Sequence, residues 1–202
     1  MSETDKVATT QGATAQPPLS KRARLASVVM RLAHELDESA DHPMPKGDLT
    51  ALRREGGARS PTFYKVAARL LSDELDAYRT ESSLVVAERQ WAMLVHLLAS
   101  TSGQHRVGAP SLGAVLQQAG LAEARFLRLL RAEGDALDSA SRAALAPLVQ
   151  QALTFDPFDL AALVLTAASA SLHYEDRDSV RRRIARDFYR AEAKENSATD
   201  SK

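Results

Sequence analysis

The sequence has no cysteine among its 202 residues, and aromatic side chains make up only 5% of it. The lack of cysteine excludes disulfides, thiolate nucleophiles and most zinc sites. No stretch approaches the roughly 20 consecutive apolar residues of a membrane helix. Residues 1–18 also lack the apolar segment that a secretory signal needs. The sequence therefore predicts a soluble, cytoplasmic protein with no membrane contact.

The sequence also lacks an excess of charge of either sign, because its 26 basic and 26 acidic residues cancel. Any preference for a polyanion must therefore come from local patterning. The five histidines show no metal-ligand spacing, and there is no nucleophile elbow, phosphate-binding glycine loop or repeated acidic pair. We therefore expect a protein that is not an enzyme and that holds no metal and no cofactor.

Abundant alanine and leucine with few aromatic residues favour helices over strands, and no segment shows a strand pattern. The fold class predicted is all-α, with two small helical bundles packed together. The expected N-terminal bundle covers residues 20–110, and the C-terminal bundle covers residues 111–195. Residues 1–19 and 196–202 are predicted to be disordered tails, because they are polar and aperiodic.

Caps and breaks in the pattern predict where helices begin and end. Ser20 is expected to cap a first helix, and Asp48 a short one. The dipeptide Ser60-Pro61 is a strong helix start, residues 134–138 are expected to form a turn, and Pro147 should kink or split the helix around it. Helices with two defined ends are predicted for residues 20–37, 49–54, 158–170 and 178–194. Three more are predicted: one that begins after Ser60, one that contains the core residue Trp91, and one that begins at about residue 139.

The most informative stretch, residues 111–131, is predicted to form a short helix, a glycine turn and a second helix. The Ser111 hydroxyl is placed to cap the first helix. Gly120 is placed to end it, because glycine adopts the left-handed conformation without a Cβ clash. On a helical wheel the second helix divides into two arcs. One arc carries Phe126, Leu127, Leu129 and Leu130, and the other carries Arg125, Arg128 and Arg131.

The polar arc of this second helix consists of arginine alone after Glu123. The planar guanidinium group matches the geometry of phosphate oxygens. The pattern therefore predicts a surface that faces phosphates. The alternative that stays open is an ordinary solvated face of a core helix.

Other arginines extend the set of candidates. The last helix carries arginines at intervals of four residues on its predicted outer face, opposite Val180, Ile184 and Phe188. Two more close the short helix after Asp48, where they could equally interact with the negative helix end. One lies beside His105 in a predicted loop. The candidate nucleic-acid-binding residues are Arg53, Arg54, Arg106, Arg125, Arg128, Arg131, Arg182, Arg183, Arg186 and Arg190.

The order and spacing of several short motifs are similar to those of the CasB family, the small subunit of the type I-E CRISPR Cascade complex. The resemblance covers about residues 47–194, and the long polar N-terminal tail departs from it. Its landmarks are Ala51-Leu52-Arg53-Arg54, Pro61-Thr62-Phe63-Tyr64, Ser111-Leu112-Gly113, Gly120, Glu123, Arg125, Leu129-Leu130-Arg131-Ala132 and Asp187-Phe188.

This resemblance implies a non-catalytic helical subunit whose copies pair head to tail, as a homodimer, beside other Cascade subunits. The subunit would contact the backbone of the hybrid between crRNA and target DNA and help to hold the displaced strand. It would thereby stabilise the R-loop in antiviral defence. In such complexes the guide RNA supplies the sequence specificity, and the protein recognises shape and charge.

Two alternatives remain open at the level of sequence. The turn at Gly120 also fits a helix-turn-helix transcriptional regulator, whose second helix enters the major groove. The start of that helix offers only Leu121, Ala122, Glu123 and Ala124, a poor set for contacting base edges. The other alternative is a plain helical scaffold with solubilising arginines. Co-purified guide RNA, a defined duplex, or no nucleic acid would separate the three.

Overall fold

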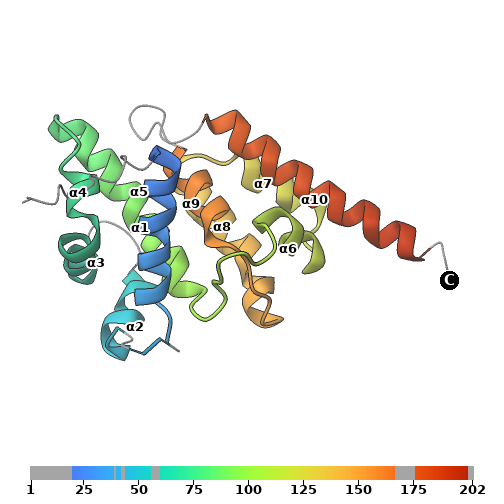
Figure 1. The fold of residues 1–202 in the computed structure, drawn as a ribbon, viewed down its shortest axis with the longest axis horizontal. Helices are drawn as coiled ribbons and strands as arrows, with labels where there is room; N and C mark the ends of the chain where they lie inside the picture. The colour runs from blue at the N-terminus through green and yellow to red at the C-terminus, as the bar shows by residue number, and fades with distance from the viewer. Residues whose placement is uncertain (1–19, 39, 42–43, 56–59, 167–175, 200–202) are drawn as a thin grey trace, which may run out of the picture.

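The computed structural model describes residues 20–38, 40–41, 44–55, 60–166 and 176–199. Apart from one isolated β-bridge between His105 and Phe155, all regular structure in these ranges is helical (Figure 1), which confirms the all-α fold. None of the helices described there is long and apolar enough to cross a membrane. The elements are α1 (Lys21–Glu35), α2 (Lys46–Glu55), α3 (Pro61–Val66), the π-helical turn η1 (Ala67–Leu71), α4 (Ser72–Leu75), α5 (Glu81–Ser100), α6 (Leu112–Gln118), α7 (Glu123–Arg131), α8 (Gly134–Gln150), α9 (Pro157–Thr166) and α10 (Arg177–Thr199).

The capping pattern locates several helix starts, although not every cap forms as expected. The Ser20 hydroxyl accepts a hydrogen bond from the Ala23 N–H at 3.2 Å, which confirms this cap. Ser60 precedes α3 as predicted, but its hydroxyl donates to the Glu55 carboxylate at 3.0 Å and does not cap the helix. Pro61 at the first helical position, with its fixed φ, is enough to set that start.

Three predicted boundaries are wrong. Asp48 does not cap α2, because the helix already begins at Lys46 and Asp48 lies within its first turn. Residues 134–138 are not a turn, because α8 begins at Gly134, whose φ of +51° suits glycine. The predicted C-terminal tail is helical as far as Thr199.

One further prediction concerns the proline within α8, and several others fall on residues that the structure does not describe. Pro147 lies inside α8, which is a single helix as far as Gln150 and is therefore not split. Residues 167–170, which we expected at the end of α9, lie outside the described residues, as do the N-terminal tail, the glycines at 56–57 and residues 200–202.

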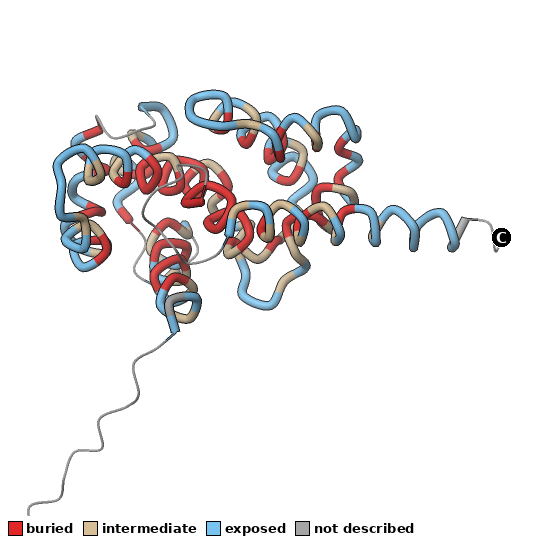
Figure 2. The backbone as a smooth tube through the Cα atoms, turned by 90° about the horizontal axis from the view of Figure 1, so that it is seen from above, coloured by how far each residue is buried: buried red, intermediate tan, exposed pale blue. Residues whose placement is uncertain are grey.

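Helices α5 and α9 form the centre of the hydrophobic core (Figure 2). Trp91 on α5 is fully buried, which confirms its predicted place in the core. The Gln90 amide donates to the carbonyls of Val164 and Leu165 at 3.1 and 3.2 Å, which ties α5 to the last described turn of α9. Helix α9 also packs against α1. Helices from both sides of residue 110 thus share a core, and the division into two bundles there stays a prediction.

The C-terminal helix α10 packs closely along α6. A Cβ atom added to Gly113 would lie 2.2 Å from the carbonyl oxygen of Ile184, so no larger residue fits between the two backbones. Beyond this contact α10 projects from the body (Figure 1), and its last described turns are exposed (Figure 2). The close approach fixes the part of α10 that carries the arginines.

Candidate nucleic-acid interface

The turn between α6 and α7 forms as the sequence predicts. Gly120 has a φ of +71°, and the N–H groups of Gly120 and Leu121 donate to carbonyls of the last turn of α6 at 2.8 and 3.0 Å. This is the hydrogen-bonding pattern that a glycine cap produces. Ser111 does occupy the capping position of α6, but its side chain makes no capping hydrogen bond, so that part of the prediction is wrong.

Aromatic contacts hold α7 against α10. Phe126 is fully buried and stacks on Phe188 with ring centroids 3.9 Å apart. The Tyr189 hydroxyl donates to the Glu123 carboxylate at 2.7 Å. Leu129 and Leu130 are buried as predicted, whereas Leu127 is only half-buried. The apolar arc therefore positions α7 firmly and fixes the direction of its other face.

The three arginines of α7 form the exposed face that the sequence predicts. Arg125, Arg128 and Arg131 are all exposed, and none forms an ion pair in the part of the chain that the structure describes. Arg128 and Arg131 border a groove between α7 and α8 that is lined mainly by alanines. We call these three residues the α7 arginine face. Its charges are available to an external anion.

The arginines of α10 fall into two groups. Arg182, Arg186 and Arg190 are exposed, as predicted for the outer face. Arg182 lies 3.9 Å from the Asp176 carboxylate, and the guanidinium of Arg186 lies 3.8 Å from the Asp187 carboxylate. Arg190 has no ion-pair partner among the described residues. The positive charge of this face is therefore partly compensated.

Arg183 does not belong to the exposed face, contrary to prediction. Its guanidinium lies against the carboxylate of Asp159 on α9 at 2.9 Å, and the two side chains are only 17% and 8% exposed. Burial raises the pKa of the Asp159 carboxyl, and the neighbouring Arg183 opposes this effect. One residue beyond Arg182 is a rotation of about 100° on a helix, which turns Arg183 toward the core. We assign Arg183 to the packing of α10 on α9.

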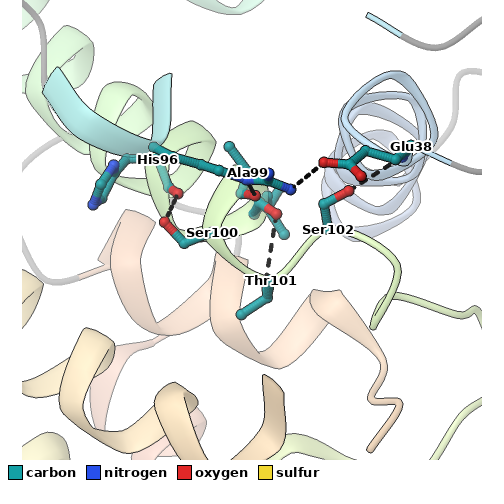
Figure 3. Close-up of polar contacts among 8 residues, drawn as sticks. Glu38, His96, Ala99, Ser100, Thr101 and Ser102 are labelled. Atoms are coloured by element: carbon teal, nitrogen blue, oxygen red, sulfur yellow. Dashed lines mark hydrogen bonds and ion pairs between the residues drawn. The ribbon is translucent and has the colours of Figure 1, made fainter. Parts of the chain in front are cut away.

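Arg53 is exposed, but its guanidinium group is engaged by other parts of the protein. It donates to the Ala99 carbonyl at 2.8 Å and pairs with Glu38 at 2.7 Å, at the end of α5 where Figure 3 shows Ala99 and Glu38. A basic side chain stabilises a helix C-terminus. The carbonyl that Arg53 contacts belongs to the C-terminal end of α5, whereas the sequence suggested the end of its own helix, α2. Arg54 is exposed and has no ion-pair partner in the described ranges.

The loop after α5 contains His105 and Arg106, and only Arg106 carries a positive charge at pH 7. His105 lies edge-on to Phe155, and one of its ring nitrogens is 2.6 Å from the Thr101 hydroxyl. Burial lowers the pKa of His105 to about 4, an effect that Asp37 only partly offsets. His105 is therefore neutral at pH 7. The Arg106 side chain is exposed, and its backbone N–H donates to the Phe155 carbonyl at 3.1 Å.

Two further arginines, Arg177 and Arg181, are not among the candidates named from the sequence. Both are half-buried and lie against Glu133, at the start of α8. Their spacing of four residues puts both on one side of the last helix. This spacing was the feature of the sequence that could have identified them as a pair. The described residues contain no group of three or more His, Asp or Glu side chains that could hold a metal ion.

Comparison with known proteins agrees with this architecture. The CasB crystal structure from Thermus thermophilus has 23% identity and a TM-score of 0.55, with 85% of this chain and 99% of that chain covered. A crystal structure of a CRISPR-associated protein of the Cse2 family, from the same species, has 22% identity and a TM-score of 0.54, with the same coverage. No curated protein sequence matches.

A family model gives the more specific result. The model described as CRISPR-associated protein Cse2 matches residues 48–189, a range that runs from within α2 to the middle of α10 and includes the whole α7 arginine face. This match and the CasB-like fold confirm the resemblance to the CasB family. The chain therefore belongs to the Cse2 family of CRISPR-associated proteins.

Proposed function

We propose that this chain is a non-catalytic small subunit of a type I-E Cascade complex and that it stabilises the R-loop by binding nucleic-acid backbone. Its partners would be crRNA, target DNA, other Cascade subunits and a second copy of itself. The observation that carries the proposal is the α7 arginine face, which is exposed and without ion pairs in the described structure. Membership of the Cse2 family supports it.

The geometry of α7 suits a run of phosphates. Arg125 and Arg131 are six residues apart, which corresponds to ~9 Å along a helix axis. Successive phosphates of one strand are separated by about 3.4 Å along a duplex. The face would thus cover two or three phosphates, and it offers no group arranged to distinguish bases.

A second set of exposed arginines is available for the same strand or for a neighbouring subunit. This set comprises Arg54 on α2, Arg106 in the loop before α6, and Arg182, Arg186 and Arg190 on α10. Nearby carboxylates compensate two of these charges, those of Arg182 and Arg186. We therefore assign the main phosphate contact to α7.

A helix-turn-helix regulator is less well supported by the geometry. Helices α6 and α7 do flank the turn at Gly120, but α6 is packed along α10. The Glu123 side chain, at the start of the would-be recognition helix, is held by Tyr189. A recognition helix needs its first residues free to reach base edges. Selective binding to one duplex sequence would favour the regulator over our proposal.

The isolated protein should bind nucleic acid weakly, without sequence preference and with steep dependence on salt. Each neutralised phosphate contributes about 0.7 to the negative slope of log K against log salt on a single strand. Changing Arg125, Arg128 and Arg131 together to glutamine should therefore reduce that slope by roughly 2. Fluorescence anisotropy with an oligothymidylate at several salt concentrations measures it.

The matched control for this experiment changes Arg31, Arg79 and Arg89 to glutamine. These arginines are also without an ion pair to any described residue, but they lie on or next to other helices. The control removes the same charge and should reduce the slope by much less. Equal slopes for the two triple variants would contradict a specific role for α7.

The purified protein should not cleave DNA or RNA when Mg²⁺ or Mn²⁺ is added. The physical reason is that two-metal cleavage needs a carboxylate cluster, and no metal-binding group occurs among the described residues. A gel assay with labelled substrates would test this. Metal-dependent cleavage that a single Asp or Glu substitution abolishes would refute the non-catalytic assignment.

A further inference from the structure

Arg177 and Arg181, on the first turns of α10, share a single carboxylate. Arg177 donates to Glu133, and the guanidinium of Arg181 lies 3.8 Å from the same oxygen. The arginine side chains are 24% and 23% exposed, whereas that of Glu133 is 60% exposed. Two positive charges therefore meet one negative charge, and the negative group is the most accessible of the three.

This carboxylate does not satisfy the two arginines. The Nε atoms of both Arg177 and Arg181 are buried and have no hydrogen-bond partner in the described parts of the chain. A guanidinium has five N–H donors, and a buried donor without an acceptor costs free energy. An anion with more acceptor oxygens, such as a phosphate, would satisfy the pair better than one carboxylate does.

The pair lies where the α7 arginine face ends. Arg131 is the last residue of α7, and Glu133 follows two residues later, so their Cα atoms are at most ~7.6 Å apart. Arg131 is exposed and forms no ion pair with a described residue. A strand that follows the α7 arginine face to its end would bring the next phosphate close to Glu133. The other charged residues within two positions of Glu133, Arg177 and Arg181 in the sequence are Asp135 on α8, Asp176 and Asp178 beside Arg177, Arg182 and Arg183 beside Arg181, and Glu175, which lies outside the described residues.

We propose that Arg177 and Arg181 form a second phosphate site, which Glu133 occupies until a nucleic-acid phosphate displaces it. The inference rests on the proposed function of the α7 arginine face. Displacement is feasible because an ion pair with an exposed member stabilises a protein only weakly. The continuity with Arg131 favours a nucleic-acid strand over an acidic protein segment as the source of the anion.

The variant Glu133→Gln tests this proposal because it keeps the shape and the acceptor oxygen and removes the competing charge. We expect the full-length variant to bind a 20-residue oligothymidylate about twofold to fivefold more tightly than wild type at low salt, the range expected for losing an exposed ion pair. The salt slope should stay close to that of wild type, because the same phosphate is bound in both proteins once Glu133 has been displaced.

Two controls separate displacement from a general charge effect. Asp135→Asn removes the same charge two residues away and should leave the affinity close to that of wild type, since Asp135 forms no ion pair with a described residue. Adding Arg177→Gln and Arg181→Gln to Glu133→Gln should abolish the gain. Thermal melting of each variant confirms that it is folded. A gain that Asp135→Asn reproduces, or that survives loss of both arginines, would overturn the proposal.

The same measurements distinguish this proposal from the one it rests on. If the α7 triple variant loses its salt slope while Glu133→Gln changes nothing, only the second phosphate site is wrong. If neither set of variants alters binding, the proposed function fails as well. A polyglutamate chain serves as a further probe: if Glu133→Gln strengthens its binding and not that of the oligothymidylate, the displacing partner is an acidic protein segment and the nucleic-acid assignment is wrong.

Discussion

Replacing Arg183 by methionine is expected to lower the free energy of unfolding by about 3–5 kcal/mol at neutral pH, the cost of leaving one partner of a buried ion pair uncompensated. Methionine keeps much of the side-chain length, so the change acts mainly on charge. The Asp159 side chain is 8% exposed and cannot recover its hydration without local opening of the helices. Urea unfolding measures the loss.

The loss should depend on pH in a defined direction. Burial raises the pKa of Asp159 above its ordinary value of 3.8 in the folded protein, and Arg183 opposes that rise. Without Arg183 the folded pKa rises further, so the folded state holds a proton that the unfolded state releases. Stability of the variant then falls as pH increases from the ordinary pKa through the raised one. We expect a smaller loss at pH 5 than at pH 8.

Two companion variants make this prediction specific. Arg182→Met changes the exposed neighbour and should alter stability by no more than about 0.5 kcal/mol. The double variant Arg183→Met, Asp159→Leu removes both charges and should recover much of the loss, as replacing a buried pair by apolar residues often does. Equal stability of Arg183→Met and wild type would show that the pair does not hold α10 on α9.

The sequence predicts local structure well where one helix determines it. The turn at Gly120 and the burial of Phe126 follow from a glycine cap and from helical periodicity, and both depend on residues close together in the chain. The exposed position of Arg125, Arg128 and Arg131 is correctly predicted for the same reason. To predict that these arginines are exposed, it is enough to recognise that the opposite, apolar side of the same helix is buried.

The partners of individual arginines could not be predicted, because they are distant in sequence. Arg183 meets Asp159, 24 residues away, and Arg53 meets the Ala99 carbonyl, 46 residues away. A helical wheel shows the direction of a side chain on its own helix and does not show which helix lies there. The contact of Arg177 and Arg181 with Glu133 could not be predicted for the same reason, since Arg177 is 44 residues from Glu133.

In a reconstituted guide-RNA complex, the Arg125, Arg128 and Arg131 triple change to glutamine should accelerate R-loop dissociation by about 100-fold. Hydrogen bonds to charged groups contribute on the order of 1.5–3 kcal/mol each before losses from geometry and solvent. About 3 kcal/mol lost over three arginines corresponds to roughly two orders of magnitude, since each 1.4 kcal/mol is tenfold. Exchange of a DNA duplex for a guide–target hybrid is nearly balanced, so such contacts can decide the lifetime.

Assembly and initial target recognition should stay close to normal in the same complex. Guide pairing and the partner subunits provide recognition, and the α7 arginine face lies opposite the residues that pack α7 in the fold. The control complex carries the Arg31, Arg79 and Arg89 glutamine changes, which remove equal charge elsewhere. Its R-loop should persist about as long as that of the wild type.

The most direct test of the central claim is the R-loop dissociation rate of four complexes: wild type, the α7 triple variant, the control triple variant, and a complex without this subunit. Single-molecule measurement of strand reannealing provides that rate. The account predicts that the α7 variant dissociates far faster than wild type and the control, and approaches the rate without the subunit. If the complex that lacks this subunit holds its R-loop as long as the complete complex, the account is wrong.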